Sequence, residues 1–192
     1  MNRKVLKYLT EYVVNSETMA IVPVLTKENV LISKVIETND EFYVLQKPLD
    51  IIEKSCRFYG ASFYGRKAGT KELIRVSHKQ SIAISPTDYL YFFPTSSYTR
   101  KDCIWVSHSH VDQTDALPHN NLLLHFITGR SIKIDVSKGS FDNQLYRTAQ
   151  LRVEFENRKE RKLFPSFQFF EPQEIFEIYP EYGDEPLPEW KE

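Results

Sequence analysis

His108, His110 and Asp112 alternate with other residues at the end of an apolar run of the sequence. Imidazole and carboxylate groups gathered in this way can bind zinc and activate a water molecule for hydrolysis. A zinc-binding pattern of the form His-x-His-x-Asp-His has a histidine at its last position, but this chain has Gln113 there, whose side chain is an amide. Alternate residues of a strand also face the same side without any metal, so the spacing of His108 and His110 does not require one. We therefore expect no metal and no other cofactor, and a zinc-dependent hydrolase is the least favoured interpretation.

A second pattern offers positive charge to a phosphate group. Gly60 and Gly65 have four residues between them and are followed by Arg66 and Lys67. A nucleotide-binding loop requires Lys and then Ser or Thr after its second glycine, because the hydroxyl binds magnesium. Arg66 and Lys67 keep the charge without that hydroxyl, and no serine-nucleophile motif occurs elsewhere. We therefore expect a protein that is not an enzyme.

Positive charge is concentrated in the middle of the chain. Residues 54–101 contain nine Lys and Arg against two acidic residues, together with nine aromatic residues and three glycines. Cations release the counterions of phosphate, aromatic rings stack on bases, and glycine permits close approach of the backbone. We expect nucleic acid to be bound here and by the helix that follows, through Arg57, Arg66, Lys67, Lys71, His78, Lys79, Arg100, Lys101 and Arg147.

The whole chain has 192 residues, a formal net charge of −1 and two cysteines. This length favours one domain, which we place at residues 1–163. So few cysteines indicate a reducing, cytoplasmic setting, and no apolar run is long enough to cross a membrane. Residues 163–192 hold eight acidic residues and one lysine, so 164–192 is expected to be an acidic, aromatic, partly disordered regulatory tail.

Two helices must position the binding residues. A short one is expected near residues 48–59, with Pro48 at its first position and Gly60 ending it. A longer amphipathic helix is expected near residues 140–162, with an apolar side formed by Phe141, Leu145, Ala149 and Val153.

The rest of the chain is patterned mainly for strands, so we expect an α+β fold dominated by antiparallel sheet. Thr128-Gly129-Arg130 predicts a hairpin turn, and Gly60 to Gly69 is expected to be a loop or tightly turned. Buried positions in a strand compete with a binding role for Tyr89, Tyr91, Phe92 and Phe93. The expected strands are 29–36, 41–46, 72–78, 82–85, 89–93, 103–108, 122–127 and 131–136.

Several stretches closely resemble the ComK family of competence transcription activators from Bacillus-like bacteria. They begin with KPLDIIEKSCRFYGASFYGRKAGT from Lys47 and continue with VSHK, FFPTSSYTR, WVSHSHV and SFDNQLYRTAQLR, in the order and spacing of the family. The resemblance covers more than half of the chain. It implies a cytoplasmic, nucleoid-associated activator of DNA-uptake genes that needs no cofactor. It also implies an oligomer that binds A/T-rich boxes of double-stranded DNA as pairs of dimers. This oligomer would contact the DNA mainly through the minor groove and would work with RNA polymerase.

The resemblance further implies turnover by a MecA-type adaptor that delivers the protein to the ClpC protease. The adaptor reads an aromatic–apolar–Tyr-Pro motif, whose nearest match here is Phe176, Ile178, Tyr179 and Pro180. Glu177 stands where the pattern is apolar, and Phe167–Pro172 is a competing placement.

The minor groove of A/T-rich DNA is narrow and strongly negative, which favours an inserted arginine or lysine. We therefore predict that Arg66 and Lys67, on the glycine-flanked loop, enter or straddle this groove. The other cations would contact phosphate and position the backbone. The alternative is a module for single-stranded nucleic acid or RNA that uses the same aromatic and basic residues as a stacking platform.

Overall fold

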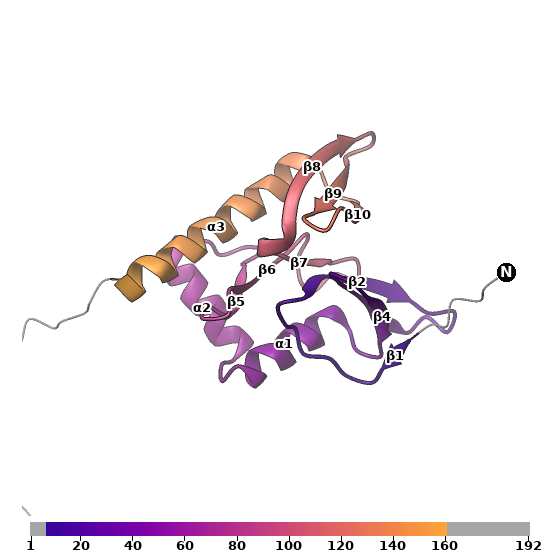
Figure 1. Cartoon of the computed structure of the whole chain (residues 1–192), viewed down its shortest axis with the longest axis horizontal. Helices are drawn as coiled ribbons and strands as arrows, with labels where there is room; N and C mark the ends of the chain where they lie inside the picture. Colours follow the sequence, from indigo (N-terminus) through magenta and orange to yellow (C-terminus); the bar gives the residue numbers. More distant parts are fainter. Residues whose placement is uncertain (1–6, 161–192) are drawn as a thin grey trace, which may run out of the picture. The chain divides into compact units, whose positions relative to one another are not determined.

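The computed structural model describes residues 7–160 of the chain (Figure 1). Within this range the strands form one sheet of seven strands and one of three, and three α-helices pack against them. Neighbouring strands are antiparallel except for β1 and β4. The predicted α+β class and its mainly antiparallel sheet are confirmed.

The larger sheet has the strand order β1-β4-β3-β2-β7-β6-β5. It begins with β1 at the edge and ends with β5, and its long central hairpin is β2 and β3. In chain order its strands are β1 (Tyr8–Leu9), β2 (Thr18–Leu25), β3 (Leu31–Glu37), β4 (Glu41–Val44), β5 (Ile82–Ser85), β6 (Leu90–Pro94) and β7 (Trp105–Ser107).

The smaller sheet has the order β10-β9-β8. Its strands are β8 (Val111–Leu117), β9 (Asn121–Phe126) and β10 (Ser131–Ile134). The predicted hairpin turn is confirmed between β9 and β10, where the Phe126 amide donates to the Arg130 carbonyl at 2.8 Å. Gly129 adopts a φ of 78° there, in the left-handed region that glycine enters without strain.

Both faces of the larger sheet are buried, so it forms the middle layer of the described part of the chain. Side chains alternate along a strand, and Phe92 therefore packs in one cluster while Phe93 packs in another. The first cluster includes Ile51 and Ile52 of α1, and the second includes residues of β9 and α3. Burial on both faces explains why β5 and β6 are buried at every position, including Tyr91, Phe92 and Phe93.

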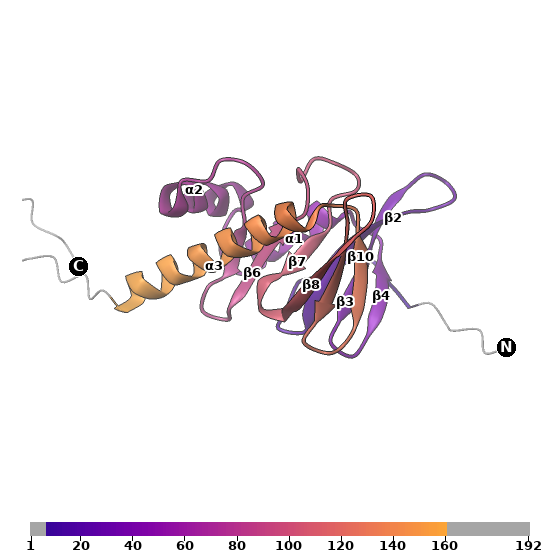
Figure 2. The ribbon, with the colours of Figure 1, turned by 90° about the horizontal axis from the view of Figure 1, so that it is seen from above.

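The helices are α1 (Pro48–Phe58), α2 (Phe63–Ile74) and α3 (Lys138–Glu160). Helices were predicted near 48–59 and 140–162, and α1 and α3 confirm both, with residues 161 and 162 outside the described range. Figures 1 and 2 both show α3 lying along β6 and β8, with α2 close to its C-terminal half.

The loop predicted from Gly60 to Gly69 and the strand predicted at 72–78 are both wrong, because α2 occupies most of this stretch. The Ser62 hydroxyl caps the helix by accepting a bond from the Gly65 amide at 2.9 Å. Within α2, burial is confined to Phe63, Thr70 and Ile74, so the sequence lacks the regular apolar stripe that identifies a helix.

The predicted apolar side of α3 is wrong in part. Phe141 is buried, but Val153 is 50% exposed, while Gln144 and Thr148 are almost fully buried. Hydrogen bonds allow this burial: the Thr148 hydroxyl lies 2.6 Å from that of Ser81, and Gln144 donates to two backbone carbonyls. A polar side chain with partners can replace an apolar one on a helix face, which the apolar pattern alone does not reveal.

Three strands had no counterpart in the sequence-based expectations. They are the two-residue β1, then β2, the centre of the larger sheet, and β8, whose polar sequence VDQTDAL leaves most of its side chains exposed. An edge strand with one face open to solvent does not need an apolar run, which explains why β8 escaped detection.

Candidate nucleic-acid interface

Three of the predicted binding residues line one cavity beside the first turns of α3. His78 and Lys79 come from the segment between α2 and β5, and Arg147 comes from α3. The cavity has a volume of about 200 Å³, and Ser140, Asn143 and Gln144 complete its lining. We call this space the cation cavity. Among the described residues, none that lines it is acidic, so it presents positive charge together with hydrogen-bond donors.

Gln144 holds the two sides of the cation cavity in place. Its side-chain amide donates to the Lys79 carbonyl at 2.6 Å and to the Pro94 carbonyl at 3.2 Å. Lys79 itself has a φ of 47°, which turns the chain sharply at this point. The hydrogen bonds of Gln144 therefore join α3, the segment before β5 and the end of β6.

Lys67 connects α2 to the loop between β6 and β7. Its ammonium group donates to the Tyr98 hydroxyl at 2.7 Å and lies 4.3 Å from the centre of the Tyr98 ring. Its carbonyl accepts a bond from Gln80 at 3.0 Å, one residue after Lys79. The predicted residues from α2, from the segment before β5 and from the β6–β7 loop thus belong to one connected region.

Arg100 and Lys101 lie in that β6–β7 loop and are exposed. The Arg100 guanidinium forms an ion pair with Asp102 at 2.6 Å. The hydrogen bond from Arg100 lowers the pKa of Asp102, and the same contact raises the pKa of Arg100. Asp102 therefore offsets part of the positive charge at this end of the region.

Arg66 does not lie on a loop and does not project freely. It belongs to α2, and its Nη2 atom donates to the Ile84 carbonyl of β5 at 3.1 Å. Its Nε atom is buried and has no hydrogen-bond partner among residues 7–160. Arg66 therefore makes a contact inside the protein. It does not occupy the loop position from which we predicted that it enters the minor groove.

Arg57 and Lys71 are exposed, at the end of α1 and in the last turn of α2. Lys54 forms an ion pair with Glu11, so its charge is already compensated. Tyr89 is 49% exposed, whereas Tyr91, Phe92 and Phe93 belong to the core, as the competing interpretation of these rings held.

Sequence reasoning missed the most exposed aromatic side chains of the basic segment. Phe58 is 69% exposed and Tyr64 is 71% exposed, on either side of the turn between α1 and α2. Their exposure could not be inferred from the sequence, because the buried Phe63 is the direct neighbour of Tyr64.

His108 and His110 lie in a short 3₁₀ turn that directly follows β7, so the predicted strand ends one residue before His108. His110 is buried, and its Nδ1 atom lies 2.9 Å from the Ser107 hydroxyl. Burial lowers the pKa of both histidines, so both are neutral at pH 7. Over residues 7–160, no three His, Cys, Asp or Glu side chains are arranged to hold a metal ion.

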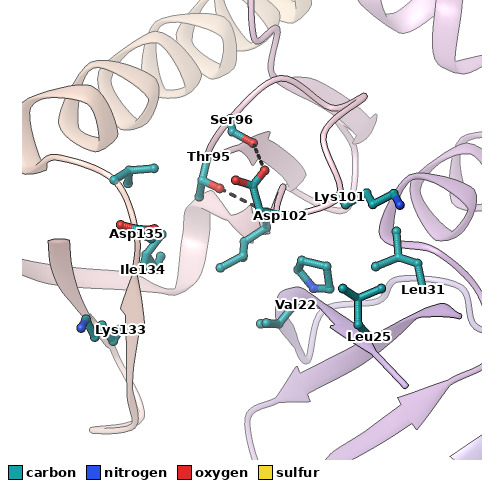
Figure 3. Close-up of a pocket in the computed structure, with 13 residues that line it drawn as sticks. Val22, Leu25, Leu31, Thr95, Ser96, Lys101, Asp102, Lys133, Ile134 and Asp135 are labelled. Carbon is teal, nitrogen blue, oxygen red and sulfur yellow. Dashed lines mark hydrogen bonds between the residues drawn. The ribbon is translucent and has the colours of Figure 1, made fainter. Parts of the chain in front are cut away.

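A second cavity, of about 350 Å³, lies between β2, the β6–β7 loop and β10 (Figure 3). Its charged residues are Lys101 and Lys133 against Asp102 and Asp135. The charges of this cavity balance, so it lacks the excess of cations that the cation cavity has.

Cations gathered from separate segments around a common surface are typical of nucleic-acid-binding proteins. Comparison with known proteins identifies the family. The family model described as "ComK protein" matches residues 9–160. The chain is also 40% identical over 163 residues to the "Competence transcription factor" of Bacillus subtilis (strain 168), which covers 85% of this chain and 84% of that protein. No solved structure matches the chain.

The chain therefore belongs to the ComK family, and the predicted resemblance is confirmed. It is a transcription regulator of the competence class, which is not a class of enzyme. None of the helices in residues 7–160 is both long and apolar enough for a membrane crossing. The predicted adaptor residues Phe176, Ile178, Tyr179 and Pro180, and the tail that contains them, lie outside the described residues.

Proposed function

We propose that the protein activates competence genes by binding double-stranded, A/T-rich DNA, mainly through the minor groove. The observation that carries this proposal is the cation cavity, in which His78, Lys79 and Arg147 face one space that no carboxylate lines, within the part of the chain that the structure describes. A phosphate oxygen is the ligand that such a lining suits, because it accepts hydrogen bonds and carries negative charge.

The predicted binding residues would have different roles in DNA binding, according to how exposed their side chains are. Exposed basic side chains would contact phosphate and so position the duplex. The residues concerned are Arg57, Lys71, His78, Arg100, Lys101 and Arg147, together with the half-buried Lys79 at the wall of the cation cavity. Lys67 would approach the groove from α2, beside Tyr98, and Arg66 would hold α2 against β5.

The choice of minor groove and A/T-rich sequence is supported by electrostatics. A/T-rich tracts have a narrow minor groove with an enhanced negative potential, which attracts inserted cations. Discrimination by groove width needs few base-specific bonds, so it suits cations carried by helix ends and loops.

Footprinting on A/T-rich duplex DNA tests the proposal directly. We expect protection of the A/T-rich box, loss of that protection when the minor-groove ligand distamycin is added, and much weaker binding to a matched G/C-rich duplex. Protection that persists with distamycin present would contradict minor-groove entry. Equal binding to both duplexes would contradict the preference for A/T-rich DNA.

The exposure of Phe58 and Tyr64 favours a second candidate, binding of single-stranded nucleic acid or RNA by stacking. Competition between duplex and single-stranded DNA of the same sequence separates the two. We expect the duplex to displace the single strand.

The proposed cellular setting follows from the same function. We propose a cytoplasmic, nucleoid-associated activator that contacts RNA polymerase and binds its boxes as pairs of dimers. Its turnover by a MecA-type adaptor and ClpC protease, through the motif around Tyr179, belongs to the same proposal. Protein made with Tyr179→Ala should outlive the unaltered protein in cells that contain the adaptor.

A further inference from the structure

The corner between α1 and α2 presents two exposed aromatic rings on a fixed base. Phe58 ends α1 and is 69% exposed, and Tyr64 lies in the first turn of α2 and is 71% exposed. Single exposed apolar residues are ordinary on soluble proteins, but two large exposed rings within one short turn are typical of a binding site.

Each exposed ring rests edge-on against an anchored one. The ring of Phe58 lies 5.1 Å from that of Tyr59, whose hydroxyl donates to the Val14 carbonyl at 3.2 Å. The ring of Tyr64 lies 5.7 Å from that of the buried Phe63. Both rings are therefore held in position before any partner arrives, which lowers the entropy lost on binding.

The backbone of the corner is equally well defined. Gly60 has a φ of 71°, and the Gly60 and Ala61 amides donate to the Arg57 and Cys56 carbonyls. A side chain at position 60 would be strained in this conformation. The corner is a compact turn that can approach a surface closely without a large side chain at its tip.

Charge identifies the kind of surface that the corner fits. From Lys54 to Lys71 the sequence contains five basic residues and no acidic one. Arg57 precedes Phe58, and the Lys67 ammonium lies 5.7 Å from the centre of the Tyr64 ring. Apolar rings with Arg57 and Lys67 beside them match a stack of bases between phosphates better than they match the polar rim of a protein partner.

We infer that Phe58 and Tyr64 form a wedge that enters between base pairs from the minor groove, unstacks that step and bends the duplex. This inference rests on the proposed function and adds to it the two side chains that deform the DNA. Apolar wedges of this kind are favoured at flexible pyrimidine–purine steps, such as TA within an A/T-rich site, because these steps are easily kinked and unstacked.

Helix α2 separates the wedge from the cation cavity. Its 12 residues separate the corner from the segment that carries His78 and Lys79, a rise of about 18 Å along the helix. The wedge and the cation cavity would therefore hold the duplex at two separate points. Phosphate contact at one point and insertion at the other is an arrangement that stabilises a bend.

The test uses the full-length protein and short A/T-rich duplexes in which one adenine at a time is replaced by the fluorescent base 2-aminopurine. Unstacking raises the fluorescence of this base, and energy transfer between dyes at the two ends of the duplex reports bending. With the unaltered protein we expect a fluorescence rise at one step and a shortened end-to-end distance. The double variant Phe58→Ala/Tyr64→Ala should lose both signals and about tenfold in affinity, the scale of a base–aromatic contact.

Two variants control the comparison. Tyr146→Ala removes an equally exposed ring from α3, 69% exposed and outside the corner, and should behave as the unaltered protein does. Phe58→Leu/Tyr64→Leu keeps apolar side chains that can still insert, so it should retain most of the bend. Circular dichroism checks the folding of each variant, and truncation of rings this exposed leaves no cavity in the core.

The possible results separate the wedge from the proposed function. Salt-dependent duplex binding without any fluorescence rise, or a double variant that bends DNA normally, would overturn the wedge alone. Absence of salt-dependent duplex binding by the unaltered protein would overturn both. A preference for single-stranded over duplex DNA would replace the wedge with a stacking platform.

Discussion

Arg66 and Arg147 are both predicted binding residues, but their guanidinium groups have different contacts. Arg66 is half-buried in α2 and donates to the Ile84 carbonyl. Arg147 is exposed at the wall of the cation cavity, with a long bond of 3.5 Å to the Gln144 side chain. The first contact stabilises the fold, and the second leaves most of the donors of Arg147 available for a phosphate.

Substituting each arginine by alanine should therefore have different effects. Arg147→Ala should lower DNA affinity about tenfold and reduce the slope of log affinity against log salt by about 0.9, the change for one lost phosphate contact. Arg66→Ala should lower the free energy of unfolding by about 1–3 kcal/mol, because the Ile84 carbonyl loses its donor. Binding titrations at several salt concentrations and urea denaturation measure the two effects.

Lys27→Ala is the matched control for charge, since Lys27 is exposed in the turn between β2 and β3, away from the cation cavity. It should leave both the salt slope and the stability nearly unchanged. If Arg66→Ala reduced the slope of log affinity against log salt as much as Arg147→Ala does, Arg66 would be shown to contact DNA. That result would contradict its assignment to packing.

At the scale of the element, α3 is attached to the rest of the described chain partly by polar side chains. Gln144 is 2% exposed and donates to carbonyls of two different segments, at Lys79 and Pro94. Loss of this side chain leaves the carbonyls of Lys79 and Pro94 without that donor and removes the bond that holds the segment carrying Lys79.

Gln144→Ala should therefore lower the free energy of unfolding by about 1–3 kcal/mol and weaken DNA binding in the molecules that remain folded. Urea denaturation and titration of an A/T-rich duplex measure these effects. Gln150→Ala, an exposed position on the same helix, is the matched control and should change neither quantity. Equal stability of the two variants would show that the bonds of Gln144 are not what attaches α3.

At the scale of the whole molecule, residues 163–192 carry a net charge opposite to that of the rest of the sequence. The chain has a net charge of −1, and residues 163–192 contribute eight acidic residues and one lysine, so residues 1–162 carry +6. A negative segment on the same chain lowers the attraction of the protein for DNA, whatever its position, to the extent that salt does not screen it.

Replacing Glu171, Glu174, Glu177 and Glu181 by glutamine in the full chain should therefore raise DNA affinity, by about tenfold at low salt and much less above physiological salt. Titrations at two salt concentrations measure the gain. A protein that ends at Lys162 should show the same trend, with circular dichroism to confirm that it folds. Affinity that is the same with and without these charges at low salt would exclude regulation by the charge of the tail.

The sequence by itself determined the family, the α+β class, the helices at Pro48–Phe58 and Lys138–Glu160, and the turn at Gly129. These depend on motif order, on capping and on local periodicity, which are properties of neighbouring residues. It also located the cations in one stretch, because composition is visible without coordinates.

Only the tertiary structure decided which of those cations meet. Gln144 and Lys79 are 65 positions apart, and their hydrogen bond forms because α3 packs against β6. The same packing buries Gln144 and Thr148 where the apolar pattern pointed to Val153. Burial of Phe63 and exposure of Tyr64 likewise depend on what lies against α2, so long-range packing selected the side chains that remain available for binding.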